Sequence, residues 1–259
     1  MTTIKNTIFL ILVLFATSCT KVIDLNLKAG EPVYVIEGNF SDDSVGNLVK
    51  ISRSVALSEP NNFPTVSNAI VTITDENGNV EILNHSQNGE YEILTTQAVF
   101  GKTYKLNVQV DGKTFTAQST MPYPTKIDSL DFLAFSFGPT ENINIVPIYV
   151  DSAGIDNYYR FVVAVNDEVS DDIFVNDDDL IDGIQARQPY FGQYELKKGD
   201  TASVTLQCID KNVYLYYFSL QQNTSGDATP ANPVTNVTGG AIGYFSAHAS
   251  SKKSRIVPQ

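Results

Sequence analysis

An acidic stretch in the second half of the chain holds the residues best suited to bind a cation. Eight carboxylates lie within sixteen residues, namely Asp167, Glu168, Asp171, Asp172, Asp177, Asp178, Asp179 and Asp182. Hard cations such as Ca²⁺ take several oxygen ligands. The calcium-loop pattern D-x-[DN]-x-[DN]-G fails, however, because the alternate positions before Gly183 include Leu180. We therefore expect a solvated acidic loop without a metal, and Asp178 and Asp182 are weak candidates for a cation site.

The few residues that resemble a nucleophilic centre do not form a complete motif. Ser250-x-x-Lys253 matches the core of a Ser–Lys hydrolase motif, but its companion motifs are missing and the segment reads as a polar C-terminal tail. His85 and His248, the only histidines, fit no metal spacing such as H-E-x-x-H, and His85 lies just before a turn, where solvent exposure is expected. Cys208 lies on the apolar side of an alternating run, which predicts a buried, inert thiol.

These absences favour a protein that is not an enzyme and has no cofactor. Gly239-Gly240-Ala241-Ile242-Gly243 is not a phosphate loop, because no Lys-Ser/Thr follows, and close strand packing or a bulge is the expected role of its glycines. Tyr and Phe are abundant in the second half, where most must fill the core, so the ligand-binding residues stay unknown. A glycan or peptide hydrolase that uses a carboxylate pair, nominally Asp178 and Asp182, is the least favoured alternative.

The elements that would position these residues are strands. Residues 32–121 contain seven strand-like runs, at 33–38, 48–53, 69–75, 80–83, 90–94, 101–110 and 113–118. Asn-Gly and Asp-Gly pairs separate several of them, as hairpin turns require. This spacing predicts an immunoglobulin-like or transthyretin-like β-sandwich. Gly101-x-x-Tyr104-x-Leu106 resembles a tyrosine corner, which gives Tyr104 a structural role.

Two prolines mark the expected end of this first domain. Met121-Pro122-Tyr123-Pro124 predicts an extended linker over 122–125, followed by a second β-rich domain over 126–259. Strand patterns recur at 127–137, 143–150, 158–165 and 202–209, and a last strand is expected at 239–247. The acidic stretch belongs to a poorly patterned insertion at 166–192. Asp210 is the expected N-cap of a single short helix over Lys211–Gln222. The fold class is therefore mainly all-β.

The N-terminus predicts a lipid anchor. Lys5 precedes nine apolar residues, Ile8 to Ala16, which are too few to span a bilayer as a helix and fit the core of a signal peptide. Ala16-Thr17-Ser18-Cys19 resembles a bacterial lipobox, so residues 1–18 would be removed, Cys19 acylated, and 19–31 would form the tether. Acyl chains on Cys19 would hold the protein at the membrane. The alternative is an ordinary signal peptide with an incidental cysteine.

The composition excludes nucleic acid as the main partner. The chain of 259 residues has 17 Lys+Arg against 29 Asp+Glu, a net charge of −12. A field of this sign repels polyanions such as DNA.

Several short motifs together resemble one family. They are Cys19-Thr-Lys-Val-Ile-Asp-Leu25, Val35-Ile-Glu-Gly-Asn39, Ala69-Ile-Val-Thr-Ile-Thr-Asp75, Gly89-x-Tyr91, Gly101-x-x-Tyr104-x-Leu106, Tyr158-Tyr-Arg-Phe161, Gly199-Asp200, Asn232-Pro-Val-Thr-Asn236 and Gly239-Gly-Ala-Ile-Gly-Tyr-Phe245. In this order they resemble the Bacteroidota lipoproteins of the family called domain of unknown function 4249. The resemblance covers the mature chain and carries over no catalytic residues.

The resemblance implies an envelope lipoprotein of the outer membrane that accompanies a TonB-dependent transporter in nutrient uptake. Acidic residues just after the lipidated cysteine favour surface export in this phylum, whereas Thr20-Lys21-Val22-Ile23 stand here. Both the periplasmic and the surface face of the membrane therefore stay open. The main alternative function is a free-standing surface adhesin or binding module.

Overall fold

The structure is a computed structural model that describes residues 32–43, 46–56, 59–137, 140–225 and 231–259. Residues 32–259 form one compact unit. The predicted signal peptide, Cys19 and the 19–31 tether lie outside the described residues. Among the described residues, no helix has both the length and the apolar character needed to cross a bilayer.

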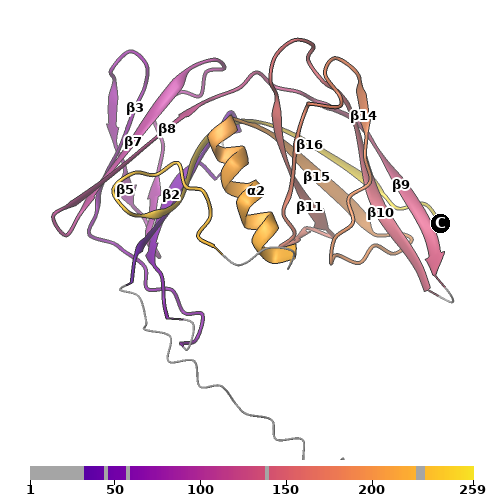
Figure 1. Cartoon of the computed structure of the whole chain (residues 1–259), viewed down its shortest axis with the longest axis horizontal. Helices are drawn as coiled ribbons and strands as arrows, with labels where there is room; N and C mark the ends of the chain where they lie inside the picture. The colour runs from indigo at the N-terminus through magenta and orange to yellow at the C-terminus, as the bar shows by residue number, and fades with distance from the viewer. Residues whose placement is uncertain (1–31, 44–45, 57–58, 138–139, 226–230) are drawn as a thin grey trace, which may run out of the picture. The chain divides into compact units, whose positions relative to one another are not determined.

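The body is built on one nine-stranded central sheet and two smaller sheets (Figure 1). The central sheet has the order β12 (Glu168–Val169), β11 (Tyr158–Val165), β15 (Thr201–Ile209), β16 (Ile242–Ile256), β1 (Tyr34–Ser41), β2 (Leu48–Arg53), β6 (Glu90–Glu92) and β5 (Asn84–His85), and β13 (Phe174–Asp177) also pairs with β11. The second sheet is β4 (Val80–Ile82), β3 (Ile70–Thr74), β7 (Thr103–Val110) and β8 (Lys113–Thr120). The third is β14 (Gln185–Arg187), β10 (Thr140–Val150) and β9 (Ile127–Phe137). The mainly all-β prediction is confirmed.

Both smaller sheets pack on the same face of the central sheet, which we call the inner face. Alternate residues of β1 and β16, such as Ile36 and Phe245, share a core with Leu106 of β7. Alternate residues of β11 and β15, such as Phe161 and Leu206, share a second core with β9 and β10. Because side chains alternate across a strand, the residues between them point to the opposite, outer face.

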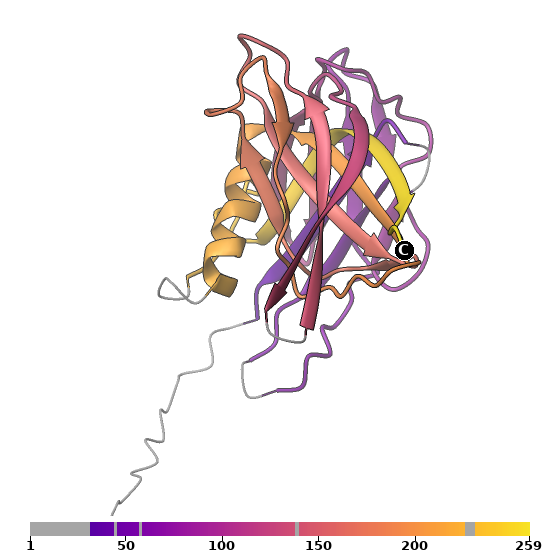
Figure 2. The same cartoon turned by 90° about the vertical axis from the view of Figure 1, so that its right-hand side faces the viewer.

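One helix, α2 (Lys211–Ser225), covers part of the outer face (Figures 1 and 2). The Asp210 carboxylate accepts hydrogen bonds from the backbone N–H groups of Asn212 and Val213, so the predicted N-cap is confirmed. Val213 and Tyr217 then pack on Tyr244 of β16 in a third, smaller core. The helix ends three residues beyond the predicted Gln222.

Two of the predicted hairpin turns have the positive φ at both central residues that primed turns require, whereas at Asn77-Gly78 only the glycine has positive φ, 86°. At Asp111-Gly112 both residues have positive φ, 48° and 73°, and connect β7 to β8 in register. Asn88-Gly89 has the same form, with φ of 51° and 76°. In the described part of residues 32–121 there is no helix, as expected.

β16 differs from the predicted last strand and changes how the two halves of the chain are connected. We expected a strand at 239–247 and a polar tail, but the strand continues to Ile256. Its first part pairs in parallel with β1, and its second part pairs with β15. The prediction of a tail was wrong. This part of β16 pairs along one side only, with β15, so its polar side chains face solvent and its sequence lacks the apolar alternation of a strand.

The predicted insertion at 166–192 is also more ordered than its pattern indicated. It contains β12, β13 and β14, which are two to four residues long. Strands this short leave no measurable periodicity in a sequence.

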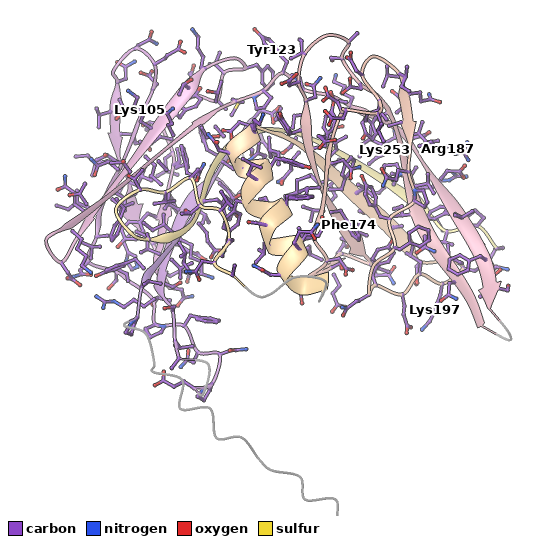
Figure 3. The ribbon with its side chains drawn as sticks, viewed as in Figure 1. Lys105, Tyr123, Phe174, Arg187, Lys197 and Lys253 are labelled. Atoms are coloured by element: carbon purple, nitrogen blue, oxygen red, sulfur yellow. The ribbon has the colours of Figure 1, made fainter. Side chains whose placement is uncertain are left out.

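Tyr123 of the predicted linker is exposed at the crossing between the first and second halves (Figure 3). The division into domains at 122–125 stays a prediction.

Candidate functional site

The acidic stretch folds so that two of its carboxylates meet a third from the end of β10. Asp178 and Asp182 lie beside Asp151, with one oxygen from each residue within 4.8 Å of the other two. Asp151 and Asp178 are buried and Asp182 is exposed. Asp151 was not predicted, although it directly follows the predicted strand 143–150. Only the pairing of β10 with β14 brings it to the acidic loop.

Each carboxylate of this acidic cluster accepts hydrogen bonds from the surrounding chain. Asp151 accepts from the Tyr159 hydroxyl and from the backbone N–H of Gly183 at 3.0 Å. Asp178 accepts from the N–H of Asn157 at 2.7 Å, and Asp182 accepts from the N–H of Gly154 at 2.6 Å. These bonds hold the loop after β13 against the turn after β10.

The surroundings of Asp178 in the acidic cluster disfavour a negative charge on its carboxyl group. Among the described residues, no Lys or Arg forms an ion pair with any of its three members. Burial raises the pKa of the Asp178 carboxyl above its ordinary value, and the nearby charges of Asp151 and Asp156 raise it further. The cluster offers three of the six to eight oxygen ligands that Ca²⁺ takes. Its hydrogen bonds already account for the loop conformation, so the fold does not require a cation there.

The other acidic residues of the stretch lie apart from the acidic cluster. Glu168, Asp171 and Asp172 line an open pocket of about 850 Å³, together with Phe174 and Lys197. Asp172 accepts hydrogen bonds from the Ser170 hydroxyl and the Gln193 backbone. Two of the eight carboxylates therefore belong to the acidic cluster and three line the pocket, whereas Asp167, Asp177 and Asp179 belong to neither.

The nucleophile candidates do not form a catalytic arrangement. Ser250 and Lys253 lie on β16, where residues three apart point to opposite faces of the strand, so the two side chains cannot cooperate. Cys208 is buried, as predicted, and burial raises the pKa of its thiol to about 11, which disfavours the reactive thiolate. His85 is exposed, as predicted.

The structural roles predicted for Tyr104 and for Gly243 are confirmed. The Tyr104 hydroxyl donates to the Gln97 carbonyl at 2.7 Å and accepts from the Val99 N–H at 2.8 Å, as in a tyrosine corner. Gly243 has a φ of 114°, and a Cβ there would lie 2.0 Å from the Ile36 carbonyl oxygen. The close approach of β1 to β16 therefore needs a glycine at this position.

One exposed apolar surface was not predicted. On β9, Leu133 and Phe135 are exposed, and Phe135 lies edge-on to exposed Phe191 with 6.2 Å between ring centroids. We call these three residues the hairpin patch. Contiguous exposed apolar side chains are typical of surfaces that contact another protein. The sequence of β9 did not indicate which of its side chains are exposed, because both faces of this strand carry apolar residues.

The sequence comparisons point to one family. No curated protein shows significant sequence similarity to the chain. The family model described as "Domain of unknown function (DUF4249)" matches residues 20–254, which covers most of the chain and all of the central sheet except the last two residues of β16. This match confirms the family indicated by the sequence motifs, and the chain belongs to the DUF4249 family.

Proposed function

We propose that this chain is a lipid-anchored, non-enzymatic accessory or binding subunit of the outer membrane that works with a TonB-dependent transporter in nutrient uptake. The observation that carries the proposal is the sequence Ala16-Thr17-Ser18-Cys19, which begins at the last residue of a nine-residue apolar run and precedes a compact body that begins at Pro32. Acyl chains on Cys19 would hold that body at the membrane surface.

The chemistry of the body supports binding rather than catalysis. Cys208 is buried with a raised thiol pKa, and Ser250 and Lys253 face opposite ways. The carboxylates of the acidic cluster, which the hydrolase alternative would use, accept hydrogen bonds from the loops that they join. The hydrogen bonds of these carboxylates favour a structural role for them.

The hairpin patch supports a protein partner. Leu133, Phe135 and Phe191 are exposed on the same side of the third sheet, in a chain whose mature form would have 16 Lys+Arg and 29 Asp+Glu, a net charge of −13. A strongly acidic surface keeps a protein soluble and apart from anionic lipid headgroups. Exposed aromatic rings on such a surface are suited to a partner with a complementary apolar face.

The anchor is tested by replacing Cys19→Ser and feeding cells a clickable fatty acid. The wild-type chain should carry the label and fractionate with the outer membrane, whereas Cys19→Ser should lose both properties. Cys208→Ser is the matched control and should keep both. Labelling that persists in Cys19→Ser would overturn the anchor.

The partnership is tested by purifying the tagged, lipidated chain from native outer membrane in mild detergent and identifying the co-purifying proteins by mass spectrometry. A stoichiometric TonB-dependent transporter is the expected result, and the double variant Phe135→Ser/Phe191→Ser should lose it. Phe63→Ser removes an equally exposed ring elsewhere and should not. Recovery of the chain alone would count against the transporter and favour the free-standing surface module.

A further inference from the structure

A polar pocket lies on the outer face of the central sheet. The helix α2 covers part of the same face (Figure 1). Its volume is about 440 Å³. Strands β1, β16, β15 and β11 each contribute side chains to its floor, among them Asn39, Ser250, Thr205 and Arg160. Such a floor is rigid, because it consists of four hydrogen-bonded strands rather than loops.

Arg160 is the unusual residue of this pocket. The chain has four arginines, and three of them, Arg53, Arg187 and Arg255, form ion pairs with aspartates. Among the described residues, Arg160 forms none, although acidic residues greatly outnumber basic ones. A guanidinium has five N–H donors in a planar fork that matches a carboxylate or phosphate. An arginine left without an acidic partner in an acidic protein is thus available to an anionic ligand.

Protein contacts hold the Arg160 side chain in one place. Its guanidinium carbon lies 4.2 Å from the centroid of the Tyr217 ring on α2, and one terminal N–H donates to the Gln207 amide oxygen at 2.9 Å. A planar guanidinium stacked on an aromatic ring keeps its edge free for hydrogen bonds. The arginine is thus oriented before a ligand arrives, which lowers the entropic cost of binding.

A partly buried chain of hydrogen bonds continues from Arg160 through Gln207 and His248, which also line the pocket. Because the Gln207 oxygen accepts from Arg160, its amide nitrogen donates to Nε2 of His248 at 3.0 Å. The proton of the neutral imidazole is then on Nδ1, which faces the Ser246 hydroxyl at 3.1 Å. His248 is 3% exposed, and its neutral imidazole adds no positive charge that would compete with Arg160 for an anion.

The rest of the pocket favours a small polar anion. Lys252 adds a second positive charge, whereas Asp43 is the one carboxylate in the lining. Asn39, Thr205 and Ser250 supply amide and hydroxyl groups that suit hydroxyl-bearing ligands. We propose that this pocket binds a small organic carboxylate, with Arg160 as the residue that anchors the carboxylate group. The proposal goes beyond the accessory role and stands whether or not the chain is lipidated.

The four arginines make a direct test possible. The full chain, labelled with ¹⁵N-arginine and held in detergent, has four Nε–Hε signals, each assigned by one Arg→Lys variant. Titration with sodium glucuronate, and separately with acetate, should shift the Arg160 signal saturably. The signals of Arg53, Arg187 and Arg255 should stay in place, and sodium chloride at equal ionic strength should have no saturable effect. Uncharged glucose should not move the Arg160 signal.

Variants give a second readout. Arg160→Lys keeps the charge but loses the fork, and should weaken glucuronate binding about tenfold, as loss of a charged hydrogen bond does. Arg187→Lys, with unchanged affinity, is the matched control. If Arg160 shows no saturable shift with either carboxylate in the wild-type chain, the proposal is wrong. Saturation by inorganic phosphate at lower concentration than by either carboxylate would also overturn it, in favour of a phosphate site.

Discussion

Among single residues, polar side chains that hydrogen-bond to the backbone show best which features of the structure can be predicted from sequence. Tyr104 was assigned a structural role from one short motif, and the structure gives its hydroxyl two backbone partners. Asp151 could not be found in the same way. Its neighbours Asp178 and Asp182 are about thirty residues away in sequence, and only the pairing of β10 with β14 joins them. Local motifs are therefore readable from sequence, whereas sites that depend on strand pairing are not.

Replacement of Tyr104→Phe should reveal what the tyrosine corner contributes. The ring would still pack edge-on against Phe40, so the change removes only the hydroxyl and its bonds to Gln97 and Val99. We expect the free energy of unfolding to fall by about 1–3 kcal/mol, because two partly buried backbone groups lose their partner. Urea unfolding measures this. Tyr123→Phe, at an exposed tyrosine, should have almost no effect, and equal losses in the two variants would contradict the assignment.

His248 should make stability depend on pH in a defined window. Burial, reinforced by the charge of Arg160, lowers the pKa of its imidazole from 6.5 to about 4. The unfolded chain therefore binds the proton first as the pH falls, so the stabilisation from neutral His248 is present above pH 6.5 and is lost as the pH falls from 6.5 towards 4.

The variant His248→Gln should lack this share of the acid sensitivity. Between about pH 7.5 and about pH 5, the wild-type chain should lose roughly 2 kcal/mol more unfolding free energy than the variant does. Urea unfolding at both pH values provides the comparison. His85→Gln, at an exposed histidine, should behave like wild type. A wild-type loss no greater than that of His248→Gln would show that His248 titrates normally in the folded state.

At the scale of elements, sequence patterns located most strands but missed how long or short some of them are. β7 and β8 were readable because apolar and polar residues alternate and a turn pair connects them. β12 and β13 were not, since a strand of two to four residues has no period to detect. The second part of β16 is polar on both faces and therefore resembled a tail. Tertiary pairing, rather than local propensity, defines these segments.

Gly243 should be the position where the pairing of β1 and β16 is most sensitive. In Gly243→Ala the new Cβ would lie 2.0 Å from the Ile36 carbonyl oxygen, on a residue with φ of 114°. We expect a loss of more than about 3 kcal/mol in unfolding free energy, because backbone strain adds to displacement of the strand.

Gly240→Ala separates the two contributions. Gly240 has a φ of 89°, but a Cβ added there would meet no atom of another part of the chain within 4 Å, so only backbone strain of about 1–2 kcal/mol is expected. Thermal and urea unfolding of both variants measure the difference. Similar losses in Gly240→Ala and Gly243→Ala would mean that the close approach to Ile36 does not matter.

At the scale of the whole molecule, β16 joins two halves that the sequence presented as separate domains. Its first part pairs with β1 and places Phe245 and Ala247 in the first core. Its second part pairs with β15 and places Ala249 in the second core. The sequence pattern indicated a boundary because prolines at 122 and 124 interrupt the strands there. No local pattern shows that the last strand returns to the first.

This connection predicts that residues 32–259 unfold in one cooperative transition. Calorimetric and van't Hoff enthalpies should agree, and Tyr104→Phe, a change in the first half, should shift the entire transition rather than part of it. Residues 32–121 expressed alone should not fold, because the first core would lack Val237, Ala241, Phe245 and Ala247 and β1 would lose its parallel neighbour. Two transitions, of which Tyr104→Phe shifts only one, would instead establish 32–121 and 126–259 as independent domains. In that case the pairing of β1 with β16 would be an interface between domains, and the pocket beside it would have a floor that opens when the two halves separate.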